Sequence, residues 1–482
     1  MNITIDSIIR ELKKHGVSNE KAKEVYEAFI IADRIHNGVI RQSGEPYITH
    51  PLNVANNLLK WEIYDPDAIS AALLHDTIED AAFDYRKQDV AASINPTVAT
   101  LVEGVTKLKG MEFTNKEAKI AANTRKLMKA TDEDIRVGYI KLADRNHNMS
   151  TISWKSEQKQ KENAAETLKL FVPLAIKIGN YKAKNELEDL SLKCMNPEAY
   201  HLIEERRSLI IEQQRPSLER MAERIQKRLN DKGIKNTIVF REKTINNIYK
   251  EINNDHKKIE NIYDISYFKI LLDSIDECYL TLGVIHSLNI PVNERIKDYI
   301  SNPRGFYQSL HTTVLDEEGN ERKIKMRTEQ MDKRDAYGLI ADLNMGRSFE
   351  KIQKEFSEKW FDKKIQEIDA EYANDIEYYN AMMEDVFSDA IYVYGPKGNI
   401  TIKKGSTALD FVCEFYSLEE LHNLSSIVVN GVEVPFDYEL KNNDTVKVVC
   451  NGRLDQNDWS EYVTTKKAKV IIKRMNEPNN AE

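Results

Sequence analysis

Three short segments in the first third of the chain combine histidine, aspartate and arginine in a way that could hold a metal ion. They are residues 41–51, 73–80 and 141–149. Two imidazoles and two carboxylates drawn from separate helices can close a mixed nitrogen and oxygen shell around one divalent ion. Such a shell suits Mn²⁺, Fe²⁺ or Zn²⁺, and no cysteine lies near these segments in the sequence.

The spacing after Asp76 indicates what a metal would do there. Glu79 and Asp80 follow by three and four residues, so on one helix they share a face with Asp76. A carboxyl group in that place can move the proton of a metal-activated water. The bland alternative is a helix end with a solvated face. However, the apolar run 68–74 leads directly into these polar groups, and unpaired buried carboxylates are costly.

The elements that must position these residues are helices. Residues 116–130 and 135–150 have amphipathic helical patterns, glycine is sparse, and no strand alternation persists over residues 1–200. We therefore predict an all-α domain over residues 1–200.

The pattern changes after a long charged helix predicted over residues 204–230. Short β-branched or aromatic runs then mix with helical segments, which predicts an α+β domain over residues 201–345. The strand runs are 237–240, 265–272, 312–315 and 322–327. The rest of the chain divides into a helical connector (346–387), a small β-rich unit (388–450) and a basic tail (451–482).

Composition limits the partners. The chain has 482 residues, and 69 basic against 78 acidic side chains give a formal net charge of −9. A phosphate-bearing partner must therefore be held by a local basic cluster or a metal ion. No apolar run reaches the roughly 18 residues of a membrane span, so we expect no membrane partner. The four cysteines are far apart, which is typical of a cytoplasmic protein. The oligomeric state stays open.

The three segments resemble the signature of the HD-type hydrolase domain of RelA/SpoT homologues, the enzymes that make and destroy guanosine tetra- and pentaphosphate. The resemblance continues through residues 104–108 and 121–128 and covers nearly the whole chain. It implies removal of the 3′-pyrophosphate from that substrate, which returns GDP or GTP.

The resemblance also implies a role for each matching residue. It implies that Mn²⁺ is bound by His50, His75, Asp76 and Asp144. It implies that Glu79 and Asp80 serve the hydrolytic water, and that Arg41 acts on phosphate. The remaining substrate contacts that it implies are Ser43, Arg145 and Asn148. Gln42 departs from the family, which often has lysine there, and we interpret His147 as structural.

Residues 237–345 resemble the synthetase domain of the same family, a nucleotidyltransferase-like fold that moves pyrophosphate from ATP to GDP or GTP. Asp264 stands where the family holds a Mg²⁺-binding aspartate, and Tyr307 where a tyrosine stacks on guanine. Further remnants of this site are Arg295, Lys297 and His311.

Several chemical positions of this second site differ from the family. The strand that normally reads E-V-Q-I is K-I-K-M here, so Lys323 replaces a glutamate that binds metal and activates the attacking hydroxyl. An ammonium there repels Mg²⁺. Lys269, Phe306 and Asp342 are further departures. We predict an inactive pseudosynthetase that still has room for a guanine nucleotide, and a need for Mg²⁺ only if synthesis survives.

Residues 388–450 resemble a TGS domain, a small β-grasp module, on the segments 393–398, 405–411 and 428–431. The resemblance implies contact with tRNA or the ribosome. We expect no counterpart of the family's zinc-finger-like and ACT-type domains in this sequence. The basic tail could contact RNA, but we expect an exposed helical face instead.

Three functions remain as alternatives. The first is a Mn²⁺-dependent hydrolase with an inactive synthetase. The second is a bifunctional enzyme in which Lys323 is tolerated or another acid, such as Asp298 or Glu321, substitutes for the lost one. The third is a ribosome-associated nucleotide sensor without catalysis. The complete histidine and carboxylate set favours the first over the third, and Lys323 favours it over the second.

Overall fold

The structure, a computed structural model, describes residues 3–81, 85–108, 115–303, 305–360, 368–387, 390–396, 398–442, 444–452 and 459–476. The chain divides into two compact units, Met1–Val386 and Phe387–Glu482. Among the residues described, no helix is both long and apolar enough to cross a membrane.

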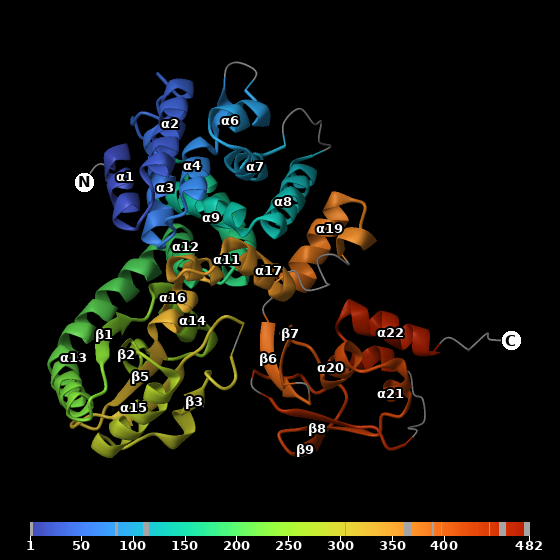
Figure 1. Cartoon of the computed structure of the whole chain (residues 1–482). Coiled ribbons are helices and arrows are strands. Elements are labelled where there is room, and N and C mark those ends of the chain that lie inside the picture. The colour runs from blue at the N-terminus through green and yellow to red at the C-terminus, as the bar shows by residue number, and fades with distance from the viewer. Residues whose placement is uncertain are drawn as a thin grey trace. The chain divides into compact units, whose positions relative to one another are not determined.

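The first unit begins as an all-α domain, as predicted. Figure 1 shows the helices of residues 5–150 gathered in one bundle. Sequence signals fix several helix starts: Asp65 caps one helix ahead of Pro66, and Asn95 caps another ahead of Pro96. The helices of this domain are α1 (Ile5–Lys14), α2 (Asn19–Ile35), α3 (Thr49–Lys60), α4 (Pro66–Leu74), α5 (Thr77–Asp80), α6 (Lys87–Ser93), α7 (Pro96–Val105), α8 (Lys116–Glu133), α9 (Ile135–Ser150), α10 (Glu157–Glu166), α11 (Val172–Lys177) and α12 (Tyr181–Met195).

A long helix, α13 (Pro197–Asp231), leads into the α+β part. It is longer than the predicted 204–230, so the predicted division at residue 200 falls inside it. A five-stranded sheet follows in the order β1-β2-β5-β4-β3, with β2 and β5 parallel and the other pairs antiparallel. Its strands are β1 (Asn236–Glu242), β2 (Ser266–Leu272), β3 (Lys297–Asp298), β4 (Leu310–Leu315) and β5 (Glu321–Thr328).

The two faces of this sheet differ in chemistry because side chains alternate along a strand. Phe268, Ile270, Ile324 and Met326 share one core with apolar side chains of α13 and of α15 (Ile275–Leu288). Figure 1 shows α13 running alongside the sheet. The alternate residues, which include Lys323 and Lys325, therefore belong to the opposite face. Two further helices, α14 (Ile245–Asn254) and α16 (Glu329–Tyr337), complete this part.

The described part of the predicted connector is mostly helical, and up to Val386 it belongs to the first unit. It contains α17 (Phe349–Trp360) and α19 (Asp375–Ala381). The Arg125 side chain on α8 forms ion pairs with Asp369 and Asp375, 2.8 and 3.1 Å away, and its guanidinium lies over the ring of Tyr378. The connector is therefore bound to the helical domain by a charged contact.

The second unit contains two sheets, β6-β7 and β10-β8-β9, which share one apolar core with its helices. Its last helix, α22, has the predicted exposed basic face, which carries Lys467, Lys469, Lys473 and Arg474, while Ala468, Ile472 and Met475 of the same helix lie in that core. The elements are β6 (Ala390–Gly395), β7 (Gly398–Lys403), α20 (Ala408–Phe415), α21 (Leu418–His422), β8 (Ser426–Val429), β9 (Val432–Val434), β10 (Val446–Val449) and α22 (Lys466–Asn476). Residues 453–458 and 477–482 of the predicted tail lie outside the described residues.

Candidate functional site

Four side chains from the three predicted segments converge at one point of the helical domain. His50 Nε2 lies 3.2 Å from His75 Nε2, and Asp76 Oδ2 lies 3.1 Å from His75 Nε2 and 3.5 Å from His50 Nε2. Asp144 Oδ1 is 3.3 Å from His50 Nε2 and 3.8 Å from His75 Nε2. Two imidazole nitrogens and two carboxylate oxygens therefore face one small volume.

This spacing fits a divalent metal ion. Bonds of about 2.1 Å place neighbouring ligand atoms roughly 3.0–3.5 Å apart in a tetrahedral or octahedral shell. The ligand atoms of His50, His75 and Asp76 all lie within 4.8 Å of one another, and both histidines are buried. The donor set, two nitrogens and two oxygens without sulfur, is the mixed shell expected from the sequence.

Helix packing holds the histidines in place. His50 lies in the first turn of α3, His75 directly follows the fully buried end of α4, and Asp144 lies on α9. The outer nitrogens of both rings are hydrogen-bonded: His75 Nδ1 to the Ala72 carbonyl oxygen at 2.8 Å, and His50 Nδ1 to His147 Nδ1 at 2.7 Å. Such bonds fix the ring orientation and leave Nε2 for a metal.

The electrostatics of the cluster keep both carboxylates ionised. Burial alone would raise the pKa of Asp76, but the His75 and His50 rings hold it well below its usual range. Burial likewise opposes ionisation of Asp144, whose pKa is lowered by Lys141, 3.0 Å away, and by His50. Burial favours a neutral His75 ring, yet Asp76 and Asp144 raise its pKa to about 9. The site therefore attracts a cation.

Asp76 begins a separate short helix and does not continue α4. Helix α4 ends at Leu74, and Asp76 stands at the N-terminus of α5, where its carbonyl oxygen accepts the backbone N–H groups of Glu79 and Asp80 at 3.0 and 2.9 Å. The helical spacing predicted after Asp76 is therefore present. The two following carboxylates have different partners. Glu79 Oε1 accepts the backbone N–H of Lys107 at 2.6 Å, whereas Asp80 Oδ2 lies 3.5 Å from Nε2 of the buried His36.

The predicted substrate residues surround the same cluster to different degrees. Arg41 lies 3.2 Å from His147 Nδ1 and 3.5 Å from Asn148 Oδ1, and Asn148 donates to Asp144 Oδ1 at 2.6 Å. Ser43 is half-buried in the turn between Arg41 and Glu45. Arg145 points elsewhere: its guanidinium pairs with Glu166 at 2.9 Å and lies over the Phe171 ring.

Three residues in or near the motifs had no role in the sequence prediction. The Tyr47 hydroxyl donates to Asp76 Oδ2 at 2.6 Å, and its ring stacks on His36 with centroids 4.5 Å apart. Lys141 pairs with Asp144. Tyr47 and Lys141 lie inside two of the singled-out segments, so their position was the available signal. His36 lies five residues before Arg41, and its sequence context carried no such signal.

The sheet carries a second charged cluster, centred on Asp264. Lys323 Nζ lies 2.8 Å from Asp264 Oδ2, and Lys243 pairs with Asp264 Oδ1 and with Glu251. Burial would raise the pKa of Asp264, but the two lysines lower it to about 2. Both oxygens of the carboxylate are therefore occupied by ammonium groups.

The other predicted remnants of the sheet site contact one another. The Tyr307 hydroxyl lies 2.6 Å from His311 Nε2 and accepts from Arg327 at 3.0 Å. Arg295 pairs with Glu321 and lies over the Tyr263 ring. Lys297 is in register with His311 on the neighbouring strand.

Both alternative acids have other partners. Glu321 is bound to Arg295, and Asp298 accepts from the Tyr279 hydroxyl at 2.8 Å. The substituted positions are also paired: Lys269 with Asp332 at 2.6 Å and Asp342 with Arg347 at 3.2 Å.

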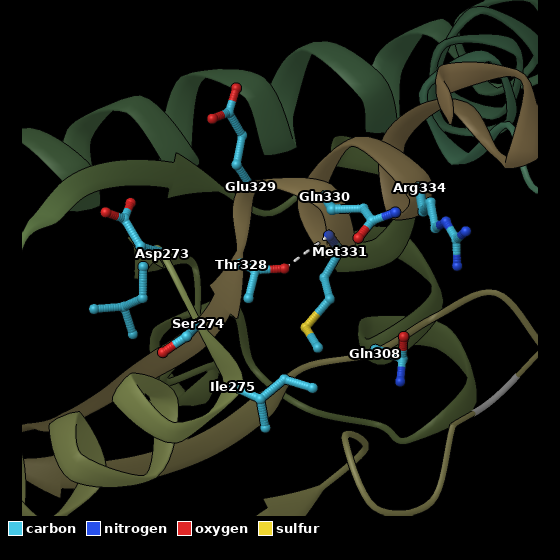
Figure 2. Close-up of a pocket in the computed structure, with 10 residues that line it drawn as sticks. Asp273, Ser274, Ile275, Gln308, Thr328, Glu329, Gln330, Met331 and Arg334 are labelled. Carbon is cyan, nitrogen blue, oxygen red and sulfur yellow. Dashed lines mark hydrogen bonds between the residues drawn. The ribbon is translucent and has the colours of Figure 1, made fainter. Parts of the chain in front are cut away.

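A cavity of about 440 Å³ opens at the other end of the parallel strands β2 and β5 (Figure 2). Figure 2 shows Ser274 and Ile275, at the start of α15, near Thr328 and Met331, at the start of α16. Asp264 precedes β2, whereas Leu272, its last residue, lines the cavity. The cavity is therefore separate from the Asp264 cluster.

Comparison with known proteins gives a match to each of the three main parts of the chain. The family patterns described as "HD domain", "Region found in RelA / SpoT proteins" and "TGS domain" match residues 28–180, 240–347 and 391–450. A protein of Aquifex aeolicus named guanosine-3′,5′-bis(diphosphate) 3′-pyrophosphohydrolase is 33% identical over 98% of this chain and 67% of its own length. The chain belongs to the RelA/SpoT family.

Two further RelA/SpoT relatives carry informative names. A Vibrio cholerae protein with the same name as that of Aquifex is 32% identical over 97% of this chain and 66% of its own length. The Escherichia coli protein named bifunctional (p)ppGpp synthase/hydrolase SpoT is 32% identical over the same shares. The chain spans 60–67% of the length of such relatives. As a RelA/SpoT member it has both charged clusters within matched regions, the first in the HD domain and the second in the RelA/SpoT region.

Proposed function

We propose that this chain hydrolyses guanosine tetra- or pentaphosphate at the HD domain, releasing pyrophosphate and returning GDP or GTP. The observation that carries the proposal is the convergence of His50 Nε2, His75 Nε2, Asp76 Oδ2 and Asp144 Oδ1. The names of the similar proteins of Aquifex aeolicus and Vibrio cholerae support it. In this reaction the bond between the 3′ oxygen and phosphorus breaks, water supplies the new oxygen, and the 3′ oxygen takes up a proton.

We propose Mn²⁺ as the cofactor, held by His50, His75, Asp76 and Asp144. When bound, such an ion supplies Lewis acidity and a nucleophilic water at neutral pH. The family resemblance favours Mn²⁺ over other divalent ions, and the mixed nitrogen and oxygen donor set is compatible with it.

The remaining side chains are proposed either to accept a proton or to bind the substrate. Glu79 and Asp80 are the groups proposed to accept the water's proton, because they follow Asp76 by three and four residues on the same short helix. Arg41 is proposed to bind a phosphate, since its guanidinium sits beside His147 at the cluster edge. Asn148, Ser43 and Arg145 are the proposed contacts to the rest of the nucleotide, and Arg145 would have to leave Glu166 to make one.

We also propose that the RelA/SpoT region no longer synthesises the alarmone. A synthetase site needs two carboxylates for Mg²⁺, whereas Lys323 here pairs with Asp264. The bifunctional alternative needs Lys323 to be tolerated or another acid, such as Asp298 or Glu321, to act instead, and both of these acids have other partners. A role in the stringent response, a cytoplasmic location and contact of the TGS domain with tRNA or the ribosome are parts of the proposal that the resemblance supports.

A paired assay on the purified chain tests these proposals. Guanosine tetraphosphate with Mn²⁺ should give GDP and pyrophosphate, and EDTA should stop the reaction. ATP and GDP with Mg²⁺ should give no product. Absence of hydrolysis with Mn²⁺ would overturn the main proposal and favour a nucleotide-sensing regulator. Product in the second reaction would favour the bifunctional enzyme.

A further inference from the structure

A buried histidine outside the predicted motifs faces one of the two carboxylates that follow Asp76. His36 directly follows α2, and its side chain is 1% exposed. Its Nδ1 lies 2.9 Å from the Ala32 carbonyl oxygen, and its Nε2 lies 3.5 Å from Asp80 Oδ2. Among the residues that the structure describes, none forms a hydrogen bond with this Nε2. A buried polar nitrogen without a hydrogen bond destabilises a fold, so this one calls for a functional explanation.

The contact with Ala32 decides which ring nitrogen of His36 carries hydrogen. A carbonyl oxygen only accepts hydrogen bonds, so Nδ1 is the donor and Nε2 of the neutral ring holds the lone pair. That lone pair faces a carboxylate oxygen of Asp80, which is also an acceptor. Two facing acceptors form a hydrogen bond only when one of them gains a proton. The pair is therefore arranged to take up one proton.

A second ring connects this pair to the proposed metal site. The Tyr47 ring stacks on His36 with centroids 4.5 Å apart, and the Tyr47 hydroxyl donates to Asp76 Oδ2 at 2.6 Å. Burial raises the pKa of Tyr47, and the charges of Asp76, Asp80 and Asp144 raise it further. The carboxylate of Asp80 therefore acts on the same hydroxyl as the two carboxylates of the metal site.

Glu79 and Asp80 differ in the kind of group that meets each carboxylate. Glu79 accepts the backbone N–H of Lys107 at 2.6 Å, and the Lys107 ammonium lies 3.7 Å from Oε2. Both of these partners are hydrogen-bond donors. His36, in contrast, offers Asp80 an acceptor, which a carboxyl group can use only after it has gained a proton. The contacts of Asp80 therefore suit it to hold a proton during a reaction.

We propose that His36 is a positioning residue for hydrolysis, which holds the Asp80 carboxyl after the proton of the attacking water has reached it, directly or through Glu79. The Asp80 O–H then donates to His36 Nε2. The same proton passes to the 3′ oxygen when the bond from that oxygen to phosphorus breaks, and the water oxygen stays on phosphorus, so the atoms balance without another reactant. This inference rests on the hydrolysis proposed above and adds to it a residue that acts through Asp80.

Steady-state kinetics of the full chain with guanosine tetraphosphate and Mn²⁺ test the proposal. His36→Phe removes both ring nitrogens but keeps an aromatic ring beside Tyr47, and the backbone N–H of residue 36 still donates to the Ala32 carbonyl oxygen. We expect kcat to fall about ten- to a hundredfold, the value of one strong hydrogen bond, with KM and bound Mn²⁺ unchanged.

A second background and a matched control separate this role from support of the fold. Asp80→Asn should itself lower kcat, and adding His36→Phe to it should cause no further loss, because the histidine acts through the Asp80 carboxyl. The control is His15→Phe, which should have the kcat of the parent chain. His15 directly follows α1, as His36 follows α2, and its ring stacks on Tyr64 with centroids 3.6 Å apart.

Several results would overturn the proposal. They are an unchanged kcat in His36→Phe, a loss of Mn²⁺ from it, an equal loss of kcat in His15→Phe, and a further loss when His36→Phe is added to Asp80→Asn. Asp80 is exposed, so Asp80→Asn should fold even if His36→Phe does not, and a normal kcat in Asp80→Asn also overturns the proposal. A parent chain without hydrolysis overturns the proposed function as well, whereas an active parent with an unchanged His36→Phe variant overturns only this role.

Discussion

The helical site and the sheet site of this chain are built from similar parts, and they differ in the kind of nitrogen that meets each carboxylate. In the HD domain, Asp76 and Asp144 face the imidazoles of His50 and His75. In the RelA/SpoT region, Asp264 faces the ammonium groups of Lys323 and Lys243. Both clusters are largely buried, and in both the carboxylates stay ionised.

The difference between imidazole and ammonium partners determines whether a buried carboxylate can bind a metal ion. An imidazolium that loses one proton exposes a lone pair, so a metal ion can displace that proton and become the partner of both groups. An ammonium has no lone pair. Burial opposes its charge, but Asp264 raises the pKa of Lys323 above its usual range, so it stays protonated. The helical site is therefore open to a metal ion, and at the sheet site an internal cation takes its place.

Asp76→Ala is expected to have the largest effect, because it should disable the helical site and leave the sheet site unchanged. It removes one ligand oxygen and the partner of His75, so metal content should be lost and hydrolysis should fall by more than about a thousandfold. Metal content is measured by mass spectrometry and hydrolysis by release of GDP. The control is Asp33→Ala, an exposed aspartate on α2. Normal activity in metal-free Asp76→Ala protein would contradict the site.

Glu79→Gln should separate chemistry from metal binding. The amide keeps an oxygen that can accept the Lys107 N–H but cannot accept a proton from water. We expect kcat to fall by about 10²–10⁴-fold with metal content unchanged. Glu20→Gln, an exposed glutamate on α2, is the matched control. Loss of metal from Glu79→Gln protein would show instead that this carboxylate is a ligand.

Tyr47→Phe tests whether the Tyr47 hydroxyl holds Asp76 in position as a metal ligand. The Tyr47 hydroxyl donates to Asp76 Oδ2, and removing such a support costs about tenfold or more in metal affinity or activity. Competition with a metal-binding dye measures the affinity, and the fold should survive because the ring is kept. Tyr26→Phe, which alters a 43% exposed tyrosine on α2, should change nothing. Unchanged metal affinity and activity in Tyr47→Phe would leave the hydroxyl without a role.

The sequence predicted which segments meet at the helical site but not how each side chain is held. The apolar run before His75 and the amphipathic helices were readable from periodicity, and the structure brings His50, His75, Asp76 and Asp144 together. The interruption between α4 and α5 and the approach of Asp80 to His36 depend on tertiary packing. Local spacing carries no information about such contacts.

Two other features show the same limit of prediction from sequence. Lys323 was recognised as a reversal of charge from sequence, but its ion pair with Asp264, 59 residues away in the chain, needed the fold. The exposed basic face of the last helix was predicted from its lysines, and the structure confirms it. The burial of its other face was not predicted, although the apolar residues 468, 472 and 475 follow helical spacing, which was the available signal.

Lys323→Glu is the smallest expected effect and the sharpest test of the sheet site. The substitution restores a second carboxylate beside Asp264, yet synthesis from ATP and GDP with Mg²⁺ should stay undetectable. Lys269 remains bound to Asp332, and Asp342 remains bound to Arg334 and Arg347. Phe306 still precedes Tyr307. The assay belongs in an Asp76→Ala background, so that hydrolysis cannot remove product, with Lys227→Glu, which alters an exposed lysine on α13, as the control. Strong synthesis from the single change would mean that Lys323 alone inactivates this site. The departures at Lys269, Phe306 and Asp342 would then be compatible with synthesis.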